Sequence, residues 1–204
     1  MEEQATALRE LAEQVAACAK CDLCRERTNA VPGEGNPNSD IVFIGEGPGF
    51  HEDQQGRPFV GQAGKFLDDL LASIRLRRQD VYICNVIKCR APNNRDPLPG
   101  EIGACKPWLD QQLEIIRPRV IVTLGRYSMN RYLPGQSIGR IHGQQRQIDG
   151  ITVVPMYHPA AALHQSSLRR TIEHDFQQLP TVLQRTLQLE AKPQEPEPVQ
   201  MQLL

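Results

Sequence analysis

Cysteine spacing gives the clearest chemical signal in this sequence. Three cysteines form a C-x2-C-x2-C run and two stand far along the chain: Cys18, Cys21, Cys24, Cys89 and Cys105. Short paired spacings let one loop present two sulfurs to one metal centre, so we predict a metal site completed by the two distant cysteines. Spacing alone leaves a four-cysteine zinc site and an iron-sulfur cluster both open. Cys84 lies in an apolar segment, where a buried structural thiol is the simpler interpretation.

Glu46 lies in a glycine-rich run, Gly45 to Gly49, directly after an apolar segment. The run lacks the third glycine of a dinucleotide fingerprint, because position 50 is Phe50. The run 61–66 likewise departs from a Walker A loop, which disfavours nucleotide triphosphate hydrolysis. What the run does provide is a backbone that a ligand can approach closely and one carboxylate; an ordinary glycine turn is the alternative.

Three further side chains could recognise or act on a base. Asn85 interrupts an apolar segment, and its amide can pair with a base edge or be satisfied by a neighbouring loop. His158 precedes Pro159 and can stabilise a developing anion, although a lone histidine is more often structural. Phe59 can stack on a base or fill the core.

These residues need elements that bring them together. Short apolar segments rich in β-branched residues predict four strands, at 41–44, 81–87, 120–124 and 151–156. Helices are expected at 3–17, 65–74 and 101–116, which favours a parallel, doubly wound α/β sheet. Ligands bind beyond the carboxyl ends of such strands, where the glycine run, Gly125 with Arg126, and His158 are expected to meet.

Composition restricts the class of protein. The chain has 204 residues and a formal net charge of -1, so it carries no polyanion-binding signature as a whole. We expect one domain over residues 1–189 and a disordered, Pro- and Glu-rich tail over 190–204. The first residues lack the pattern of a secretory signal, so a cytoplasmic protein without disulfides is expected.

Four motifs in order resemble the family 4 uracil-DNA glycosylases, the iron-sulfur branch found in bacteria and archaea. They are Gly45 to Gly49, Gly56 to Gly64, Ile83 to Arg90 and His158 to Ala161, within a resemblance from about Cys18 to Leu179. The resemblance implies a three-layer α/β/α fold with a central four-stranded parallel sheet. It also implies base-excision repair, in which uracil is flipped out of DNA and its N-glycosidic bond is hydrolysed to leave an abasic site.

The resemblance also assigns ligands and roles. A structural four-iron four-sulfur cluster is implied on Cys18, Cys21, Cys89 and Cys105, and Cys24 departs from the family pattern. Glu46 and His158 are the implied catalytic residues, with His158 stabilising charge on uracil O2. The implied substrate-binding residues are Gly45, Gly47, Glu52, Phe59 and Asn85. Among these, Phe59 stacks on uracil, Asn85 reads its N3 and O4 edge, and Glu52 crowds C5 against thymine.

We also expect contacts with DNA and with a partner protein. Pro159, Ala160 and Leu163 are expected to contact DNA, with Arg169 and Arg170 nearby or on a solvated helix face. The C-terminal residues Gln200, Leu203 and Leu204 are typical of a short sliding-clamp-binding peptide. We expect a monomer associated with the nucleoid.

Three other functions compete with this interpretation. A family 5 glycosylase of broader base specificity is disfavoured because that family lacks the carboxylate that Glu46 supplies. A uracil-trapping relative would carry a histidine in the insertion after Cys89, and 90–95 has none. A noncatalytic metal-containing nucleic-acid-binding module belongs to a different class, and the colour of the purified protein separates colourless zinc from an iron-sulfur cluster.

Overall fold

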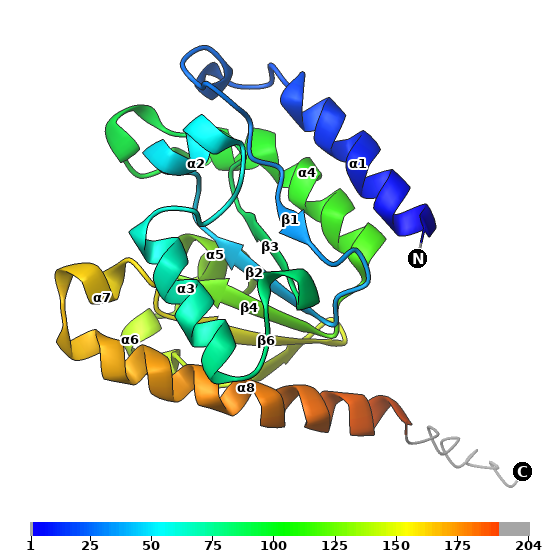
Figure 1. Cartoon of the computed structure of the whole chain (residues 1–204), viewed down its shortest axis with the longest axis vertical. Helices are drawn as coiled ribbons and strands as arrows, with labels where there is room; N and C mark the ends of the chain where they lie inside the picture. The colour runs from blue at the N-terminus through cyan, green and yellow to red at the C-terminus, as the bar shows by residue number, and fades with distance from the viewer. Residues whose placement is uncertain (1, 192–204) are drawn as a thin grey trace, which may run out of the picture.

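A six-stranded sheet forms the centre of the molecule. A computed structural model of the chain describes residues 2–191 (Figure 1). The strands follow the order β1-β3-β2-β4-β6-β5 across the sheet. Their bounds are β1 Glu34–Gly35, β2 Ile41–Gly45, β3 Tyr82–Asn85, β4 Val120–Leu124, β5 Arg146–Ile148 and β6 Ile151–Met156.

The four inner strands run parallel, as the sequence predicted. Parallel pairs join β2 to β3, β2 to β4, and β4 to β6. The two outer strands, β1 and β5, pair antiparallel with their neighbours and were not predicted. The prediction of four strands is therefore confirmed for the centre of the sheet and incomplete at both edges.

Helices cover both faces of the sheet, which makes three layers. In Figure 1, α1 and α4 run side by side on one face, while α3 and α8 cover the other. The helices are α1 Glu2–Ala16, α2 Phe50–Gln55, α3 Gln62–Ser73, α4 Pro99–Ile116, α5 Arg126–Tyr132, α6 Ile138–Ile141, α7 Ala161–His164 and α8 Ser167–Ala191. Short 3-10 turns lie at Asp22–Cys24, Arg78–Asp80 and Pro92–Asn94.

Successive residues of β2 face opposite sides of the sheet, and each side packs against helices to form a separate hydrophobic core. Every residue of β2 is buried, because helices exclude water from both faces. Phe43 faces α8 and stacks on Phe176 with ring centroids 5.8 Å apart, while Val42 and Ile44 face the α1 and α4 layer. In that second core, Val15 of α1 packs with Trp108 of α4.

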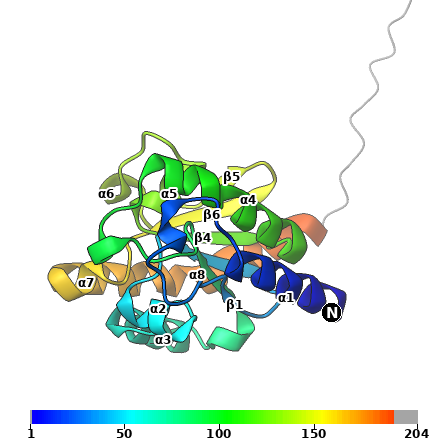
Figure 2. The same cartoon turned by 90° about the horizontal axis from the view of Figure 1, so that it is seen from above.

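The carboxyl ends of the parallel strands all open at one end of the sheet. Figure 2 shows α2 and α7 gathered at that end, away from the N-terminus of α1. No helix within residues 2–191 combines the length and apolarity needed to cross a bilayer. The predicted disordered tail began at residue 190, but residues 190 and 191 belong to α8, which runs to Ala191. The rest of that segment, 192–204 with Gln200, Leu203 and Leu204, lies outside the described residues.

Gly64 allows the first turn of α3 to pack against the loop that carries Phe59. A Cβ atom on Gly64 would lie 1.8 Å from the carbonyl oxygen of Phe59. Only a residue without a side chain can therefore occupy this position with the loop in its present place.

We expect Gly64→Ala to lower the free energy of unfolding by about 2 kcal/mol or more, because the loop must move away from α3. The matched control is Gly103→Ala in α4, where an added Cβ meets nothing within 4 Å. Alanine is favoured over glycine inside a helix, so the control should unfold at the same or a higher urea concentration. Equal urea midpoints for the two variants would contradict the packing argument.

Candidate active site

One cleft at the carboxyl ends of the strands brings together most of the residues predicted for catalysis and substrate binding. Its lining includes six of them and one predicted DNA-contacting residue: Glu46, Gly47, Glu52, Phe59, Asn85, His158 and Ala160. They come from the ends of β2, β3 and β6, from α2 and from the loop before α3. The convergence expected for a parallel sheet is thus present in the structure.

Gly45 does not line the cleft, but its lack of a side chain leaves space for two residues that do, Asn85 and Phe59. A Cβ atom on Gly45 would lie 2.4 Å from Oδ1 of Asn85 and 2.7 Å from Cζ of Phe59. The absence of a side chain at Gly45 allows the amide and the aromatic ring to approach each other. Gly47 serves similarly beside Ile87, whose Cγ1 would be 2.6 Å from an added Cβ.

Asn85 ends β3, whereas the sequence placed it near the middle of a longer strand. Its side chain is 1% exposed, and Oδ1 has no hydrogen-bond partner among the described residues. A buried amide oxygen without a partner costs free energy, so its retention indicates a ligand that donates to it. The backbone oxygen of Asn85 is occupied, because it accepts a hydrogen bond from Nζ of Lys88 at 2.8 Å.

The Phe59 and His158 rings lie against each other at the bottom of the cleft. Their centroids are 5.4 Å apart with an angle of 22° between the ring planes. Phe59 is buried and has a φ of 53°, a left-handed conformation that costs free energy for a residue with a side chain.

His158 is held as a neutral imidazole. Burial lowers its pKa to about 4, although the Glu52 carboxylate acts in the opposite direction. Nδ1 accepts a hydrogen bond from the backbone N–H of Ala160 at 3.1 Å. In the neutral ring the proton therefore resides on Nε2, which is left as a donor.

Glu46 lies half-buried in the wall of the cleft. Burial raises the pKa of its carboxyl group, Asp96 raises it further, and Arg126 lowers it. Asp96 and Arg126 both line the cleft and form an ion pair with each other. The sequence placed Arg126 at this rim without a role, whereas Asp96 was missed because no local pattern marks it.

Glu52 binds backbone groups with both carboxylate oxygens. Oε2 accepts from the N–H of Gly49 at 3.1 Å. Oε1 accepts from the N–H groups of Val60 and Gly61 at 2.8 and 2.9 Å. The carboxylate thus fixes the start of α2 to the Phe59 loop, a function that the sequence did not predict.

The predicted DNA-contacting residues are more dispersed. Pro159 lies between His158 and Ala160, two residues of the cleft wall, and Leu163 is 46% exposed on α7. Arg169 pairs with Glu173 at 2.9 Å and lies over the Phe66 ring at 4.4 Å. Arg170 is exposed on the same helix, so the structure does not bring these two arginines into the cleft.

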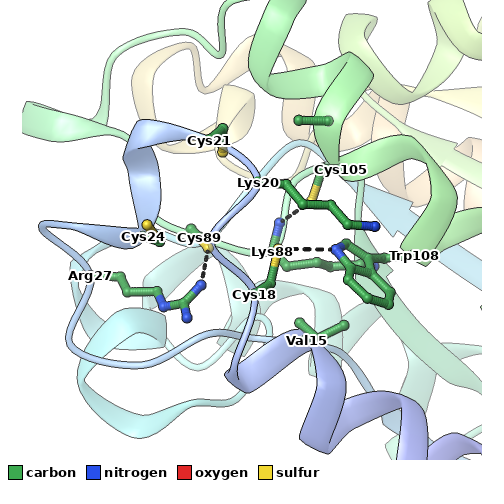
Figure 3. A pocket seen from close by; sticks show the side chains of 11 residues that line it. Val15, Cys18, Lys20, Cys21, Cys24, Arg27, Lys88, Cys89, Cys105 and Trp108 are labelled. Atoms are coloured by element: carbon green, nitrogen blue, oxygen red, sulfur yellow. Dashed lines mark hydrogen bonds between the residues drawn. The ribbon is translucent and has the colours of Figure 1, made fainter.

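A second cavity is lined by five cysteines from three parts of the chain. They are Cys18, Cys21, Cys24, Cys89 and Cys105 (Figure 3). Within residues 2–191, these side chains are not already arranged as a group of three or more metal ligands. Cys84 does not line this cavity and is fully buried in β3, as the sequence predicted.

Three N–H groups donate to sulfurs in this cavity. Arg27 Nη1 lies 3.1 Å from Sγ of Cys89, and Trp108 Nε1 lies 3.3 Å from Sγ of Cys18. The backbone N–H of Lys88 donates to Sγ of Cys105 at 3.2 Å. Figure 3 shows these donors pointing at their sulfurs from different sides of the cavity. Such donors suit negatively charged sulfur, so the cavity fits thiolate ligands of a metal or cluster.

Comparisons with known proteins point to one superfamily. A family model described as the uracil DNA glycosylase superfamily matches residues 32–179. A type-4 uracil-DNA glycosylase of Sulfurisphaera tokodaii is 48% identical over 84% of this chain and 83% of its own. Another from Archaeoglobus fulgidus is also 48% identical, over 84% of this chain and 91% of its own. A type-5 uracil-DNA glycosylase of Pyrobaculum aerophilum is 30% identical over 70% of each chain.

The buried imidazole generates a prediction that nuclear magnetic resonance can check. We expect His158 in the folded protein to stay neutral, with its proton on Nε2, until the pH approaches about 4. The unfolded imidazole takes up a proton near its ordinary pKa of 6.5, so this residue makes folding less favourable as the pH falls between the two values. A midpoint near 6.5 for the His158 ring nitrogens in the folded protein would contradict the prediction.

Proposed function

We propose that Asn85, Phe59 and His158 carry recognition and catalysis in this chain, which belongs to the uracil-DNA glycosylase superfamily and, like its type-4 relatives, removes uracil from DNA. The reaction hydrolyses the N-glycosidic bond and leaves an abasic site for base-excision repair. A base inside the duplex is out of reach, so uracil must be flipped into the cleft. The observation that carries the assignment is the buried Asn85 amide, whose Oδ1 has no partner among the described residues.

Asn85 distinguishes uracil from cytosine in this proposal. Its Oδ1 accepts from N3–H of uracil, and its Nδ2 donates to O4. Cytosine presents an acceptor at N3 and a donor at N4, the opposite pattern, so the same amide rejects it. Phe59 stacks on the flipped ring, and the proximity of the two side chains that Gly45 allows supports their contact with one base.

His158 stabilises the leaving group. When the bond between C1′ and N1 breaks, the electron pair stays on uracil, and negative charge develops at O2. The Nε2–H of a neutral imidazole donates to that oxygen, and no charged donor is needed. A water molecule adds to C1′, and the proton that it releases is balanced by protonation of the departing uracil anion, so the products are the abasic sugar and neutral uracil. We assign Glu46 to orient this water, because its carboxylate lines the same cleft.

The remaining site residues keep the roles that the resemblance implied. Glu52 lines the cleft and is held by three backbone N–H groups, which supports its proposed position beside C5, where it excludes the methyl group of thymine. Gly47 lets the strand end approach the base. Pro159, Ala160 and exposed Leu163 contact the DNA, with Leu163 wedging into the space left by uracil. Arg169 and Arg170 are proposed to contact phosphates.

Four cysteines are proposed to hold a four-iron four-sulfur cluster. The assigned ligands are Cys18, Cys21, Cys89 and Cys105, and Cys24 lines the same cavity without being assigned as a ligand. Three of the four assigned sulfurs already accept hydrogen bonds, which supports thiolate character. When bound, the cluster supplies a structural cross-link between the N-terminal segment and α4 and takes no part in hydrolysis.

Further proposals concern the chain as a whole. We infer that residues 1–189 form one glycosylase domain, since α1 packs on α4 within the second core. The protein acts as a monomer on single- or double-stranded DNA in the nucleoid. Gln200, Leu203 and Leu204 remain the proposed contact with the sliding clamp.

Excision from a labelled oligonucleotide with one uracil tests the function, with thymine, cytosine and hypoxanthine oligonucleotides as controls. We expect cleavage at uracil alone, scored as alkali-labile abasic sites. His158→Ala should lower the single-turnover rate by about 100- to 1,000-fold, the usual effect of losing one oxyanion-type donor.

Asn85→Asp should reduce uracil excision and favour cytosine relative to the wild type, because a carboxylate accepts from an amino group and cannot donate to O4. Asn130→Asp, the same change at an exposed position on α5, is the matched control. Excision of hypoxanthine by the wild type would instead favour the broader, family 5 specificity.

Metal content tests the cluster. Anaerobically purified protein should be brown and contain iron and acid-labile sulfide, whereas zinc held by four thiolates would be colourless. Cys105→Ala should lose the visible absorption, while Cys24→Ala, a neighbouring thiol in the same cavity, should retain it. Loss of iron from both variants would show that the ligand assignment is wrong.

A further inference from the structure

We propose that Arg78, a residue outside the cleft, is a positioning residue for uracil excision that acts through Phe59. Its guanidinium holds the loop before α3 in the conformation that presents the Phe59 ring to the base. The inference rests on the proposed stacking role of Phe59 and adds a residue to it. Arg78 lies in the short 3-10 turn Arg78–Asp80, just before β3.

The guanidinium binds two consecutive carbonyl groups of the Phe59 loop. Nη1 donates to the Phe59 oxygen at 2.9 Å, and Nη2 donates to the Pro58 oxygen at 2.5 Å. The planar, forked donor group of arginine suits this double contact, which a lysine ammonium cannot reproduce in the same geometry.

The peptide group between Phe59 and Val60 is held at both ends by opposite charges. Arg78 binds its carbonyl oxygen, and Glu52 Oε1 accepts from its N–H at 2.8 Å. Peptide rotation on either side of this group would break a charge-assisted hydrogen bond. This is the place where Phe59 adopts its left-handed φ of 53°, a conformation that persists only when its surroundings impose it.

Arg78 is itself anchored from the side away from the cleft. Its Nε and Nη2 donate to Glu34 Oε1 at 2.8 and 2.6 Å, and its Nη1 donates to Asp68 at 3.0 Å. Glu34 belongs to β1 and Asp68 to α3, so the sheet edge and a helix both fix the guanidinium. The side chain is only 21% exposed, which limits solvent screening of these contacts.

Arg57 provides a matched control for the charge of Arg78. It pairs with the same Glu34 at 2.7 Å, and its hydrogen bonds in the described part of the chain go to that carboxylate. Its side chain is 57% exposed. Arg57→Gln therefore removes a positive charge beside Glu34 and leaves the two loop carbonyls bound to Arg78.

The test compares Arg78→Gln, Arg78→Lys and Arg57→Gln in the full-length holoprotein. We expect Arg78→Gln to slow single-turnover uracil excision by about tenfold or more, since charged hydrogen bonds to the loop are lost. Inhibition by free uracil should weaken in parallel, while the affinity for the same DNA without uracil stays within about twofold. Arg57→Gln should match the wild type. Arg78→Lys keeps the charge beside Glu34, and it should fold and still be slowed.

A double-mutant cycle with Phe59→Ala shows whether the effect passes through the ring. In that background Arg78→Gln should change the rate by less than about twofold, because the ring it positions is gone. Three outcomes would overturn the inference while leaving the stacking role of Phe59 in place: a full additional loss in the double variant, an unchanged rate in both Arg78 variants, or an equal loss in Arg57→Gln. Uracil excision by the wild type establishes the proposed function separately, and normal excision by Phe59→Ala would refute the stacking role together with this inference.

Discussion

The buried ammonium group of Lys88 connects the end of β3 to helix α4. Nζ of Lys88 lies 2.8 Å from the Asn85 backbone oxygen and 2.6 Å from Gln112 Oε1, and the side chain is 1% exposed. Gln112 belongs to α4 and donates onward to the Pro32 oxygen at 2.8 Å. The backbone N–H of Lys88 contacts Cys105 Sγ. Burial lowers the pKa of Lys88, and the oxygens of Asn85 and Gln112 are the hydrogen-bond partners that favour its charged form. The end of β3, helix α4 and the thiol cavity therefore form one unit.

The cleft combines glycines that leave space with the Glu52 carboxylate, whose two oxygens both accept hydrogen bonds. Gly45 and Gly64 bring Asn85, Phe59 and α3 closer than any side chain would allow, and Glu52 fixes the loop between them. The groups proposed to face the base, in contrast, have hydrogen-bonding atoms that no other described residue uses. Asn85 Oδ1 has no internal partner among the described residues, and Nε2 of His158 carries a proton available to a ligand. Rigid surroundings with unsatisfied donors and acceptors are the arrangement expected of a preorganised site.

The sequence was sufficient for the features that depend on local pattern. Buried β-branched runs such as Val120–Leu124 predicted the parallel strands, and the strand-end rule then placed Glu46 and His158 at one rim. Edge strands β1 and β5 were missed because they are short and carry polar residues with no alternation to detect. Arg27, Trp108 and Arg78 were missed for another reason. Each acts on a partner at least 19 residues away, and no local spacing records such contacts. The shift of Asn85 from the middle of β3 to its end has the same origin, since pairing with Gly45 of β2 sets where the strand stops.

The two short outer strands have a consequence for the protein in a crowded cell. A parallel sheet with a long, bare edge would expose a row of unpaired N–H and C=O groups on which another chain could add a strand. Here β1 spans 2 residues and β5 spans 3, and both run against their neighbours. Arg146 at the start of β5 adds a positive charge to one edge, and Glu34 in β1, engaged by Arg57 and Arg78, closes the other with side chains. The apolar central strands are thereby screened from edge-to-edge aggregation, and Arg78, which engages Glu34 at one edge, also binds the loop that carries Phe59.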